Sequence, residues 1–335
     1  MKTALIKGRN TNTEVNTRIL VIGAGVLGCN LANDFFKAKK DVTLLARDKW
    51  AKTLRENGLT IRNKLLFRKT FHIPIVEELK PNDEYDIIFV VMKYTQLDSI
   101  IEVLNANGTR NIVLVGNNPK ASAYERMLPG KNVLFGFASC AGHRSNEEVV
   151  SFDIKKITIG PAQGRSNTDW RELVSSTFAD TGYNVTYEPD LEDFLLCHAA
   201  YVLPIVFACY KTNGKLRKVL HNAPYLNKIV HANVEGYSAI EKTGRSIKPD
   251  ADKNYKTQQY HDMCMRFLKL MCATFLGKIC ASDHALNAVD EMSALNRDMK
   301  AFFDAAGASY PTWKELEKDL FEYESHSEMT GNQKR

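Results

Sequence analysis

The sequence lacks the cysteine patterns of a zinc site or of a disulfide framework. Its seven cysteines are scattered over 335 residues without a CxxC pair, show no convincing ligand spacing to histidine, and are odd in number. Reduced thiols therefore fit the sequence better than disulfides, and we expect no bound metal.

A long hydrophobic run is also missing. The longest apolar stretch, residues 199–209, is too short to cross a bilayer and contains Pro204. Residues 1–17 are polar and mixed, without the apolar segment of a signal peptide. We therefore expect a cytoplasmic protein without a membrane partner, and loose termini over residues 1–16 and 325–335.

Positive charge is not concentrated in any one part of the chain. Lysine and arginine total 45 against 39 acidic residues, which gives a net charge of +6, and they are spread along the sequence. A nucleic-acid-binding protein would cluster its basic residues, so we expect no nucleic-acid partner. An anionic small molecule accounts for the excess more simply.

The most informative stretch that is present reads RILVIGAGVLGCN, residues 18–30. A β-branched apolar run flows into Gly23, Gly25 and Gly28 and then into helix-forming sequence. In a dinucleotide site the first glycine allows a tight turn, the second leaves room for the pyrophosphate, and the third lets the helix pack on the strand. The phosphates then lie at a helix N-terminus, here beside Val26 and Leu27.

A second strand over residues 41–45 begins where a helix over 27–39 should end, as a dinucleotide-binding unit requires. The glycines and this spacing together predict a nicotinamide cofactor bound by Gly23, Gly25, Val26, Leu27 and Gly28. The alternative is a glycine turn without a ligand.

Arg47, just after the second strand, decides between the two nicotinamide cofactors. A carboxylate at this point binds the ribose 2′-hydroxyl of NAD, whereas a guanidinium suits the 2′-phosphate of NADP. We therefore expect NADP(H). Asp48 argues for NAD, but it precedes a helical segment over residues 49–57, where an aspartate is more simply an N-cap. Alternatively, Arg47 is only a solvated surface charge.

Further strand-like runs recur in the first half of the chain, with helical or loop segments between them. They cover residues 85–92, 111–116, 133–138, 156–160 and 184–187. The first two are near-continuous apolar runs, typical of strands buried on both faces of a parallel sheet.

After Glu188, Pro189 and Asp190, helical periodicity replaces the strand signals. Helices are expected over residues 198–210, 226–243, 255–276 and 285–306. The fold class is therefore α/β, with a Rossmann-type parallel-sheet domain over 17–188 and an all-helical domain over 190–324. An apolar helical domain is also compatible with a homodimer.

Several short motifs follow the glycine loop along the chain. A lysine, Lys93, follows the 85–92 strand and an asparagine follows the next one; the helical half carries Pro204, the sequence NGKLR at 213–217, and Glu291 ahead of Gly307 and Pro311. With these motifs the chain resembles the ketopantoate reductase family from residue 18 to about residue 320. The resemblance implies an enzyme that reduces the ketone of 2-dehydropantoate (ketopantoate) with NADPH in pantothenate biosynthesis.

The resemblance assigns three residues to the active site. Lys93 matches the lysine near the nicotinamide and substrate, Asn117 the asparagine of the following loop, and Glu291 the carboxylate that partners the catalytic lysine. Asn118 rivals Asn117, and both asparagines are also common turn residues before a proline. Lys93 could instead face solvent at a strand end, and Glu291 could belong to a solvated helix face.

The sequence departs from the family at the chemistry itself. Counting back from Pro204 puts Leu195 at the position of the catalytic lysine, and Ala199 and Leu203 at those of its two asparagines. Reducing a ketone needs a hydride at carbon and a proton, or an equivalent dipole, at oxygen, and leucine supplies neither.

His198 is the replacement that we expect, because it lies about one helical turn beyond Leu195 and its ordinary pKa suits proton donation near neutrality. The alternative is a histidine packed among its neighbours. Tyr201 and Lys93 are other groups that could reach the oxygen, whereas His143 and His284 are expected in loops.

The sequence thus predicts an NADPH-dependent reductase of a 2-oxo acid or related ketone, with its active site in the cleft between the two domains. Loss of the family lysine and asparagines suggests a substrate other than ketopantoate. One alternative is a protein that binds NADP(H) without turnover, as a sensor or interaction module. Another is an opine or 3-hydroxy acid dehydrogenase, for which the helical half lacks the expected catalytic pair.

Overall fold

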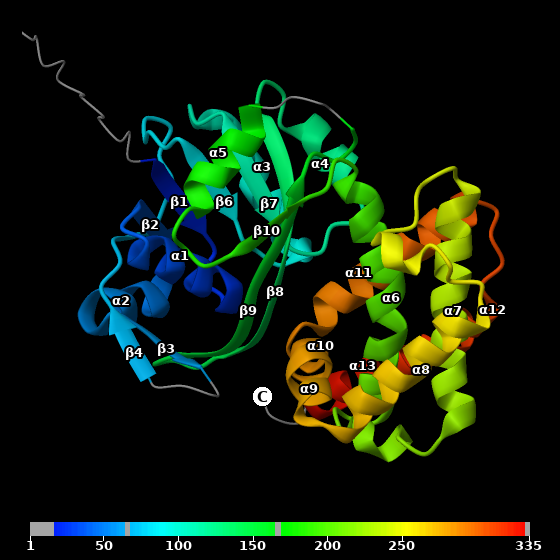
Figure 1. The fold of residues 1–335 in the computed structure, drawn as a ribbon. Coiled ribbons are helices and arrows are strands. Elements are labelled where there is room, and N and C mark those ends of the chain that lie inside the picture. Colours follow the sequence, from blue (N-terminus) through cyan, green and yellow to red (C-terminus); the bar gives the residue numbers. More distant parts are fainter. Residues whose placement is uncertain (1–16, 64–67, 165–168, 332–335) are drawn as a thin grey trace, which may run out of the picture.

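The protein consists of a sheet domain followed by a helical domain, lying side by side in Figure 1. The computed structural model describes residues 17–63, 68–164 and 169–331. The predicted loose terminus over residues 1–16 lies outside these ranges. The predicted carboxyl-terminal one overlaps the last described helix, which continues to Gly331.

Ten strands within the described residues form one sheet, in the order β4-β3-β9-β8-β7-β6-β1-β2-β5, with β10 beside β9. The strands are β1 (Arg18–Ile22), β2 (Asp41–Leu45), β3 (Leu59–Asn63), β4 (Arg68–Phe71), β5 (Ile75–Val76), β6 (Ile87–Val90), β7 (Asn111–Val115), β8 (Asn132–Arg144), β9 (Val149–Gly160) and β10 (Asn184–Tyr187). The helices of this domain are α1 (Val26–Lys37), α2 (Asp48–Asn57), α3 (Asp98–Ala106), α4 (Ala121–Met127) and α5 (Asp169–Phe178), with a 3₁₀ turn η1 (Tyr94–Gln96).

Strand β1 shows why the sheet is buried on both faces. Successive side chains of a strand point to opposite faces. Ile19 and Val21 accordingly enter a core with residues of α1 and α5, whereas Leu20 and Ile22 enter a second core with α3. That second core continues into the helical domain, so the two domains share packed apolar side chains.

The predicted α/β fold class is confirmed, but the sheet is mixed and not wholly parallel. Strands β8 and β9 form a long antiparallel hairpin, and β3 pairs antiparallel with β4. The outer part of β8 is only half-buried, so no apolar run marks it, and its predicted end at residue 138 was six residues short. Strands β3 to β5 were missed for a similar reason, because β4 is mostly exposed and β5 has two residues.

The second half of the described chain is helical. Its helices are α6 (Leu191–Lys211), α7 (Ala223–Lys242), α8 (Gln258–Ala273), α9 (Phe275–Gly277), α10 (Asp283–Asn287), α11 (Val289–Ala305), α12 (Pro311–Leu316) and α13 (Lys318–Gly331). Shorter turns are η2 (Leu216–Val219), η3 (Asp250–Asp252) and the π-helical η4 (Lys278–Ser282).

Two predicted helices are interrupted in the structure. The segment 255–276 divides at Thr274, whose extended backbone ends α8 and caps α9. The segment 285–306 divides at Ala288, between α10 and α11. Helical periodicity continues through both breaks, so the sequence pattern did not reveal them.

Helix α6 is the central helix of this domain. By length and composition it could cross a membrane, but most of its residues are buried inside the protein. This is the pattern of a core helix surrounded by other helices. Pro204 lies within it without ending it.

Candidate active site between the two domains

The glycine loop after β1 has the backbone geometry that the sequence predicted. Gly23 has a φ of +106°, and a Cβ there would lie 2.1 Å from the carbonyl oxygen of Val91. A Cβ on Gly28 would lie 1.9 Å from the carbonyl oxygen of Gly23. Gly25 is exposed and has nothing within 4 Å of such an atom, so the space above it is free.

Helix α1 begins directly after this loop, with Val26 and Leu27 in its first turn. Backbone N–H groups of a first helical turn have no partner within the helix and carry partial positive charge. The loop and the helix end therefore make a site that fits the pyrophosphate of a dinucleotide.

Arg47 is exposed just beyond β2 and stands at the N-cap position of α2, where its side chain makes no capping hydrogen bond. The glycine loop is held to the same strand, because the N–H of Gly23 donates to the carbonyl of Leu45. The prediction of Asp48 as the N-cap was wrong: α2 begins at Asp48 itself, which has a φ of +54°.

Glu291 of α11 and Asn117 of the loop after β7 meet between the domains. Asn117 Nδ2 donates to Glu291 Oε1 at 3.3 Å, and the N–H of Tyr94 donates to the same oxygen at 3.4 Å. Glu291 is buried, so the alternative of a solvated helix face was wrong.

The neighbouring Asn118 has a different position. Its Oδ1 accepts from the N–H of Lys120 within the turn, and its buried Nδ2 has no hydrogen-bond partner among the described residues. Of the two candidates, Asn117 is thus the one that contacts the helical domain.

Lys93 lies three residues after the end of β6 and also contacts the helical domain. Its Nζ donates to Asp290 Oδ1 at 2.9 Å and to the carbonyl of Asn287 at 3.3 Å. Burial raises the pKa of Asp290, but the hydrogen bond and charge of Lys93 outweigh it, so the pKa of this carboxyl lies below its ordinary value. Lys93 is therefore partnered and not simply a solvent-facing lysine.

A second polar cluster joins the domains behind Glu291. Asp298 of α11 accepts from the Tyr94 hydroxyl and from Lys120 Nζ, both at 2.6 Å. These residues and Tyr124 line a cavity of about 320 Å³. Asp290, Tyr94 and Asp298 had no motif that would have singled them out in the sequence.

His198 lies on α6 in an aromatic environment. Its ring centroid is 4.0 Å from that of Phe137 on β8 and 6.5 Å from the nearly parallel ring of Phe194. Burial lowers the pKa of His198 to about 4, with a smaller contribution from the charge of His284. The imidazole is therefore neutral at pH 7, and the expectation that its ordinary pKa suits proton donation was wrong.

No hydrogen bond within the described part of the chain joins His198 to Lys93, Asn117 or Glu291. The structure brings the last three together where the segments after β6 and β7 meet α11, whereas His198 lies on α6, near enough to His284 of α10 for that residue to lower its pKa. His143 lies in β8 and His284 in α10, so neither is in a loop as predicted.

The residues that stand where the resemblance expects the family's lysine and two asparagines are buried among apolar side chains. Leu195, Ala199 and Leu203 all belong to the core shared by the two domains. Tyr201 is half-buried, its pKa is raised by burial, and its ring lies 6.2 Å from that of Phe267.

Sequence reasoning missed Arg144 and Trp50, which both contact the glycine loop. Trp50 Nε1 and Arg144 Nη1 each donate to the carbonyl oxygen of Ala24 at 3.0 Å. The predicted strand over 133–138 ended before Arg144, so no signal connected this residue with the loop.

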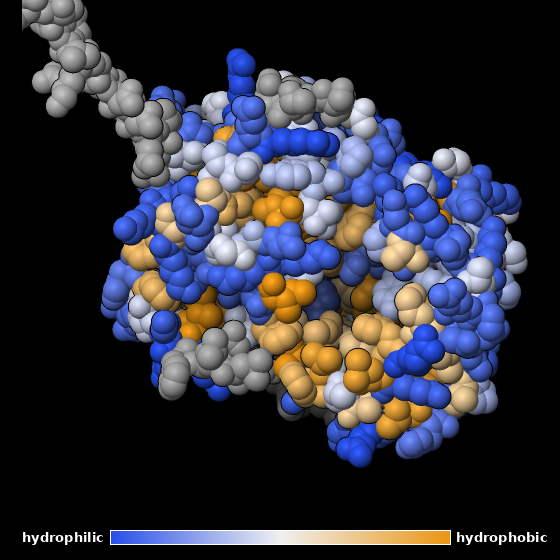
Figure 2. Space-filling model, viewed as in Figure 1, coloured by the Kyte–Doolittle hydropathy of each residue, from blue (hydrophilic) through white to orange (hydrophobic). Residues whose placement is uncertain are grey.

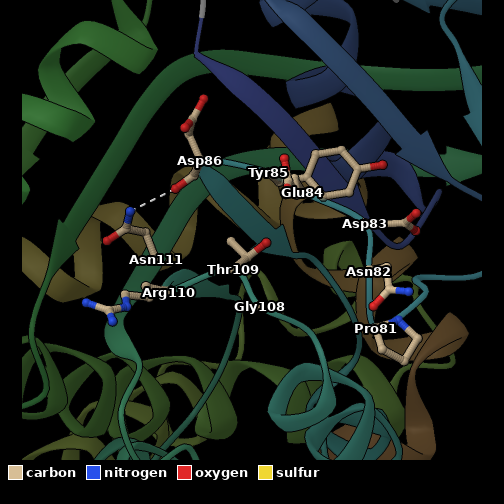
Figure 3. A pocket seen from close by; sticks show the side chains of 10 residues that line it. All are labelled: Pro81, Asn82, Asp83, Glu84, Tyr85, Asp86, Gly108, Thr109, Arg110 and Asn111. Carbon is tan, nitrogen blue, oxygen red and sulfur yellow. Dashed lines mark hydrogen bonds between the residues drawn. The ribbon is translucent and has the colours of Figure 1, made fainter.

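One cavity lies away from these residues. It has a volume of about 640 Å³ and is lined by residues that precede β6, including Asp83, Tyr85 and Asp86, and by Asn111, the first residue of β7 (Figure 3). Asn111 donates there to the carbonyl of Asp86 at 2.8 Å. Because the glycine loop, Lys93 and Asn117 follow the carboxyl ends of their strands, this cavity is at the opposite edge of the sheet.

No disulfide bond links any of the seven cysteines, all of which lie within the described residues. No group of three or more His, Cys, Asp or Glu side chains within the described ranges is arranged to hold a metal ion.

Residues 19–164 match the family model described as ketopantoate reductase PanE/ApbA. A comparison with curated protein sequences finds no significant match.

Solved structures share the fold over nearly the whole chain. A 2-dehydropantoate 2-reductase from Geobacter metallireducens is 18% identical, with 91% of this chain and 99% of that chain covered and a TM-score of 0.75. A dimeric ketopantoate reductase from Staphylococcus aureus is 15% identical, with 92% and 99% covered and a TM-score of 0.70.

A D-mandelate dehydrogenase in a ternary structure with NADH and anilino(oxo)acetate is 13% identical, with 92% and 98% covered and a TM-score of 0.76. At such low identities, these three likenesses establish the fold alone.

Proposed function

Because residues 19–164 match the ketopantoate reductase family model and the chain as a whole shares the fold of solved members, we propose that it is an NADPH-dependent oxidoreductase that reduces the ketone of a 2-oxo acid. One observation carries this proposal. The glycine loop, Lys93 and Asn117 follow the carboxyl ends of β1, β6 and β7, and Lys93 and Asn117 contact α11 of the helical domain there. Ligands of open parallel sheets bind at this edge.

The glycine loop and Arg47 fit the pyrophosphate and the 2′-phosphate of NADP. Gly23, Gly25 and Gly28, with the first turn of α1, would hold the pyrophosphate, because a side chain is absent where the phosphates need to approach. Arg47 would pair with the 2′-phosphate of NADP, since its exposed guanidinium has no competing cap contact. When bound, the reduced nicotinamide supplies the hydride.

Lys93 is the best-placed group for the developing charge on the ketone oxygen. Its ammonium is half-buried beside the interdomain contact and carries three donors, of which two have partners. A fixed positive charge in a partly desolvated site stabilises an oxyanion, and the same ammonium would give the alkoxide its proton and regain one from solvent, to which Lys93 is partly exposed. Asn117 and Glu291 would fix the loop after β7 relative to α11. A neutral His198 could orient the substrate through an N–H, but it is not a proton donor at pH 7.

Ketopantoate is one candidate substrate, and pantothenate biosynthesis would then be the pathway. The buried Leu195, Ala199 and Leu203 favour a different 2-oxo acid, because they offer no hydrogen bonds to the polar end of ketopantoate. The neighbouring D-mandelate dehydrogenase was solved with anilino(oxo)acetate, so aryl 2-oxo acids belong among the compounds to test.

We extend the proposal to a cytoplasmic homodimer. Exposed apolar side chains of α8 and α9, namely Met263, Phe267, Leu270 and Phe275, lie on the helical domain, where hydrophobic residues gather in Figure 2. A similar enzyme from Staphylococcus aureus is dimeric. Light scattering of wild type and Leu270→Glu tests this: a dimer that dissociates in the variant supports it, and a wild-type monomer contradicts it.

The decisive experiment follows NADPH oxidation by absorbance against ketopantoate and a panel of alkyl and aryl 2-oxo acids. Turnover that is lost in Lys93→Ala supports the proposal. Saturable NADPH binding without oxidation on any keto acid would favour the second candidate, a non-catalytic NADP(H)-binding protein. The supporting observation for it is that α6 carries the buried apolar residues Leu195, Ala199 and Leu203 where the resemblance expects a lysine and two asparagines.

A further inference from the structure

Arg144 reaches over the glycine loop from the end of the β8–β9 hairpin. The outer part of β8 packs on α1, so the last residue of the strand comes close to the start of that helix. Two contacts fix the side chain: Nη1 donates to the carbonyl of Ala24 at 3.0 Å, and the guanidinium lies 5.0 Å from the ring centroid of Trp50.

Trp50 is fixed in turn by the same carbonyl, to which its Nε1 donates at 3.0 Å. The indole is nearly fully buried, so it is a rigid support for the guanidinium. Ala24 stands between Gly23 and Gly25, in the middle of the loop. The three residues therefore place a positive charge beside the open space above Gly25.

Nothing within the described part of the chain neutralises this charge. Arg144 is exposed and forms no ion pair with a described carboxylate, whereas Arg62, also on the sheet, pairs with Glu148. The bond to Ala24 uses one of the five guanidinium N–H groups. The charge of Arg144 also acts on Cys29 in α1. Burial raises the pKa of the Cys29 thiol to about 12, and the charge of Arg144 lowers it in part.

We propose that Arg144 is a phosphate-binding residue that contacts the pyrophosphate of the dinucleotide cofactor. This inference rests on the proposed function and adds a residue that lies outside the glycine motif. A guanidinium that is held in place by a backbone carbonyl and an aromatic ring loses little freedom on binding, and its remaining donors suit phosphate oxygens.

The two arginines then have separate roles. Arg47 at the end of β2 recognises the 2′-phosphate that only NADP carries, whereas Arg144 at Ala24 binds the pyrophosphate that NAD and NADP share. This difference separates a phosphate ligand from a residue that only holds the hairpin against the loop.

The experiment measures the dissociation constants of NADPH, NADH and 2′-AMP by fluorescence or calorimetry for the full chain. The variants are Arg144→Gln, Arg144→Lys and Arg47→Gln, and Arg110→Gln at the opposite edge of the sheet serves as a control with the same charge change. Thermal unfolding of each variant establishes that it is folded.

We expect Arg144→Gln to weaken the binding of NADPH and of NADH by the same factor, about tenfold or more, and to leave the binding of 2′-AMP unchanged. Arg144→Lys keeps the charge without the planar fork and should lose less. Arg47→Gln should raise the dissociation constants of NADPH and 2′-AMP but not that of NADH. Arg110→Gln should bind all three compounds with wild-type affinity.

Wild-type affinity in a folded Arg144→Gln would overturn the inference and leave the proposed function standing. A loss confined to NADPH and 2′-AMP would also overturn it, because Arg144 would then lie at the 2′-phosphate. Failure of the wild type to bind any dinucleotide would remove the proposed function itself and this assignment with it.

Discussion

Asn117 donates to the carboxylate of Glu291 at 3.3 Å, although 174 residues separate them in the chain. The bond joins the loop after β7 to helix α11, so it crosses from the sheet domain to the helical domain. Tyr94 donates its N–H to the same oxygen, and Glu291 is buried. One carboxylate thus fixes two loops at the carboxyl edge of the sheet relative to the helices.

Replacing Glu291 by alanine should loosen this contact between the domains. The buried donors of Asn117 and Tyr94 would lose their acceptor, at a cost of about 1–3 kcal/mol in the free energy of unfolding. Glu291→Gln keeps the side-chain volume and one acceptor oxygen, so its free energy of unfolding should decrease less. Thermal or urea unfolding of both variants measures this, and equal stability of wild type and Glu291→Ala would contradict it.

The parts of the fold that the sequence predicted are those with local signals. Strand β1 and the glycine loop were recognisable because apolar and glycine residues follow each other directly. The outer part of β8 and the whole of β4 were missed, since their half-exposed, partly polar residues resemble loops, and β3 and β5 were missed because their apolar stretches are short. The breaks at Thr274 and Ala288 interrupt helices without interrupting their apolar periodicity.

The candidate site was predictable only where a motif marked it. Asn117 and Glu291 were found through the family resemblance, and the structure brings them together. Arg144, Trp50 and Ala24 come from three different elements, so their contact depends on how the β8–β9 hairpin packs on α1. The low pKa of His198 also depends on tertiary burial, which the sequence does not reveal.

Substitutions of Lys93 and Asp290 distinguish the effect of the lysine's charge on catalysis from the effect of its ion pair with Asp290. Lys93→Ala should lower kcat about a hundredfold or more, because the cation that faces the ketone oxygen is lost. Asp290→Asn removes the ion-pair partner but retains Lys93, so its kcat should change much less. Steady-state kinetics on the best 2-oxo acid measures both; equal losses in the two variants would assign Lys93 a structural role only.

Gly25 and Gly28 offer a matched pair of substitutions in the glycine loop. Gly25→Val should give a folded protein that no longer binds the dinucleotide, because the added side chain projects into free space where the pyrophosphate would lie. Gly28→Ala should lower the melting temperature strongly, since its Cβ would lie 1.9 Å from the carbonyl of Gly23. Circular dichroism and cofactor titration distinguish these effects, and full binding by Gly25→Val would contradict the site.

His198 should make the stability of the protein depend on pH below neutrality. Burial lowers its pKa to about 4 in the folded state, from an ordinary value of 6.5. Above pH 6.5 the imidazole is neutral in both the folded and the unfolded chain, so it contributes no pH dependence. As the pH falls from 6.5 towards 4, the unfolded chain takes up a proton that the folded protein does not, and the free energy of unfolding decreases. The decrease from this residue is at most about 3 kcal/mol.

His198→Phe keeps an aromatic ring beside Phe137 and Phe194 and removes the titrating group, so it isolates this contribution. Urea unfolding of wild type and variant at several pH values from 7 to 4 should give curves that converge or cross as the pH falls, because only the wild type loses stability through His198. His284→Ala should make the decrease in stability slightly smaller, since it removes a neighbouring charge that lowers the pKa of His198 and so brings the folded-state pKa closer to the unfolded value. Parallel pH dependence of wild type and His198→Phe would mean that His198 is protonated alike in the folded and unfolded states, and its exclusion as a proton donor would no longer hold.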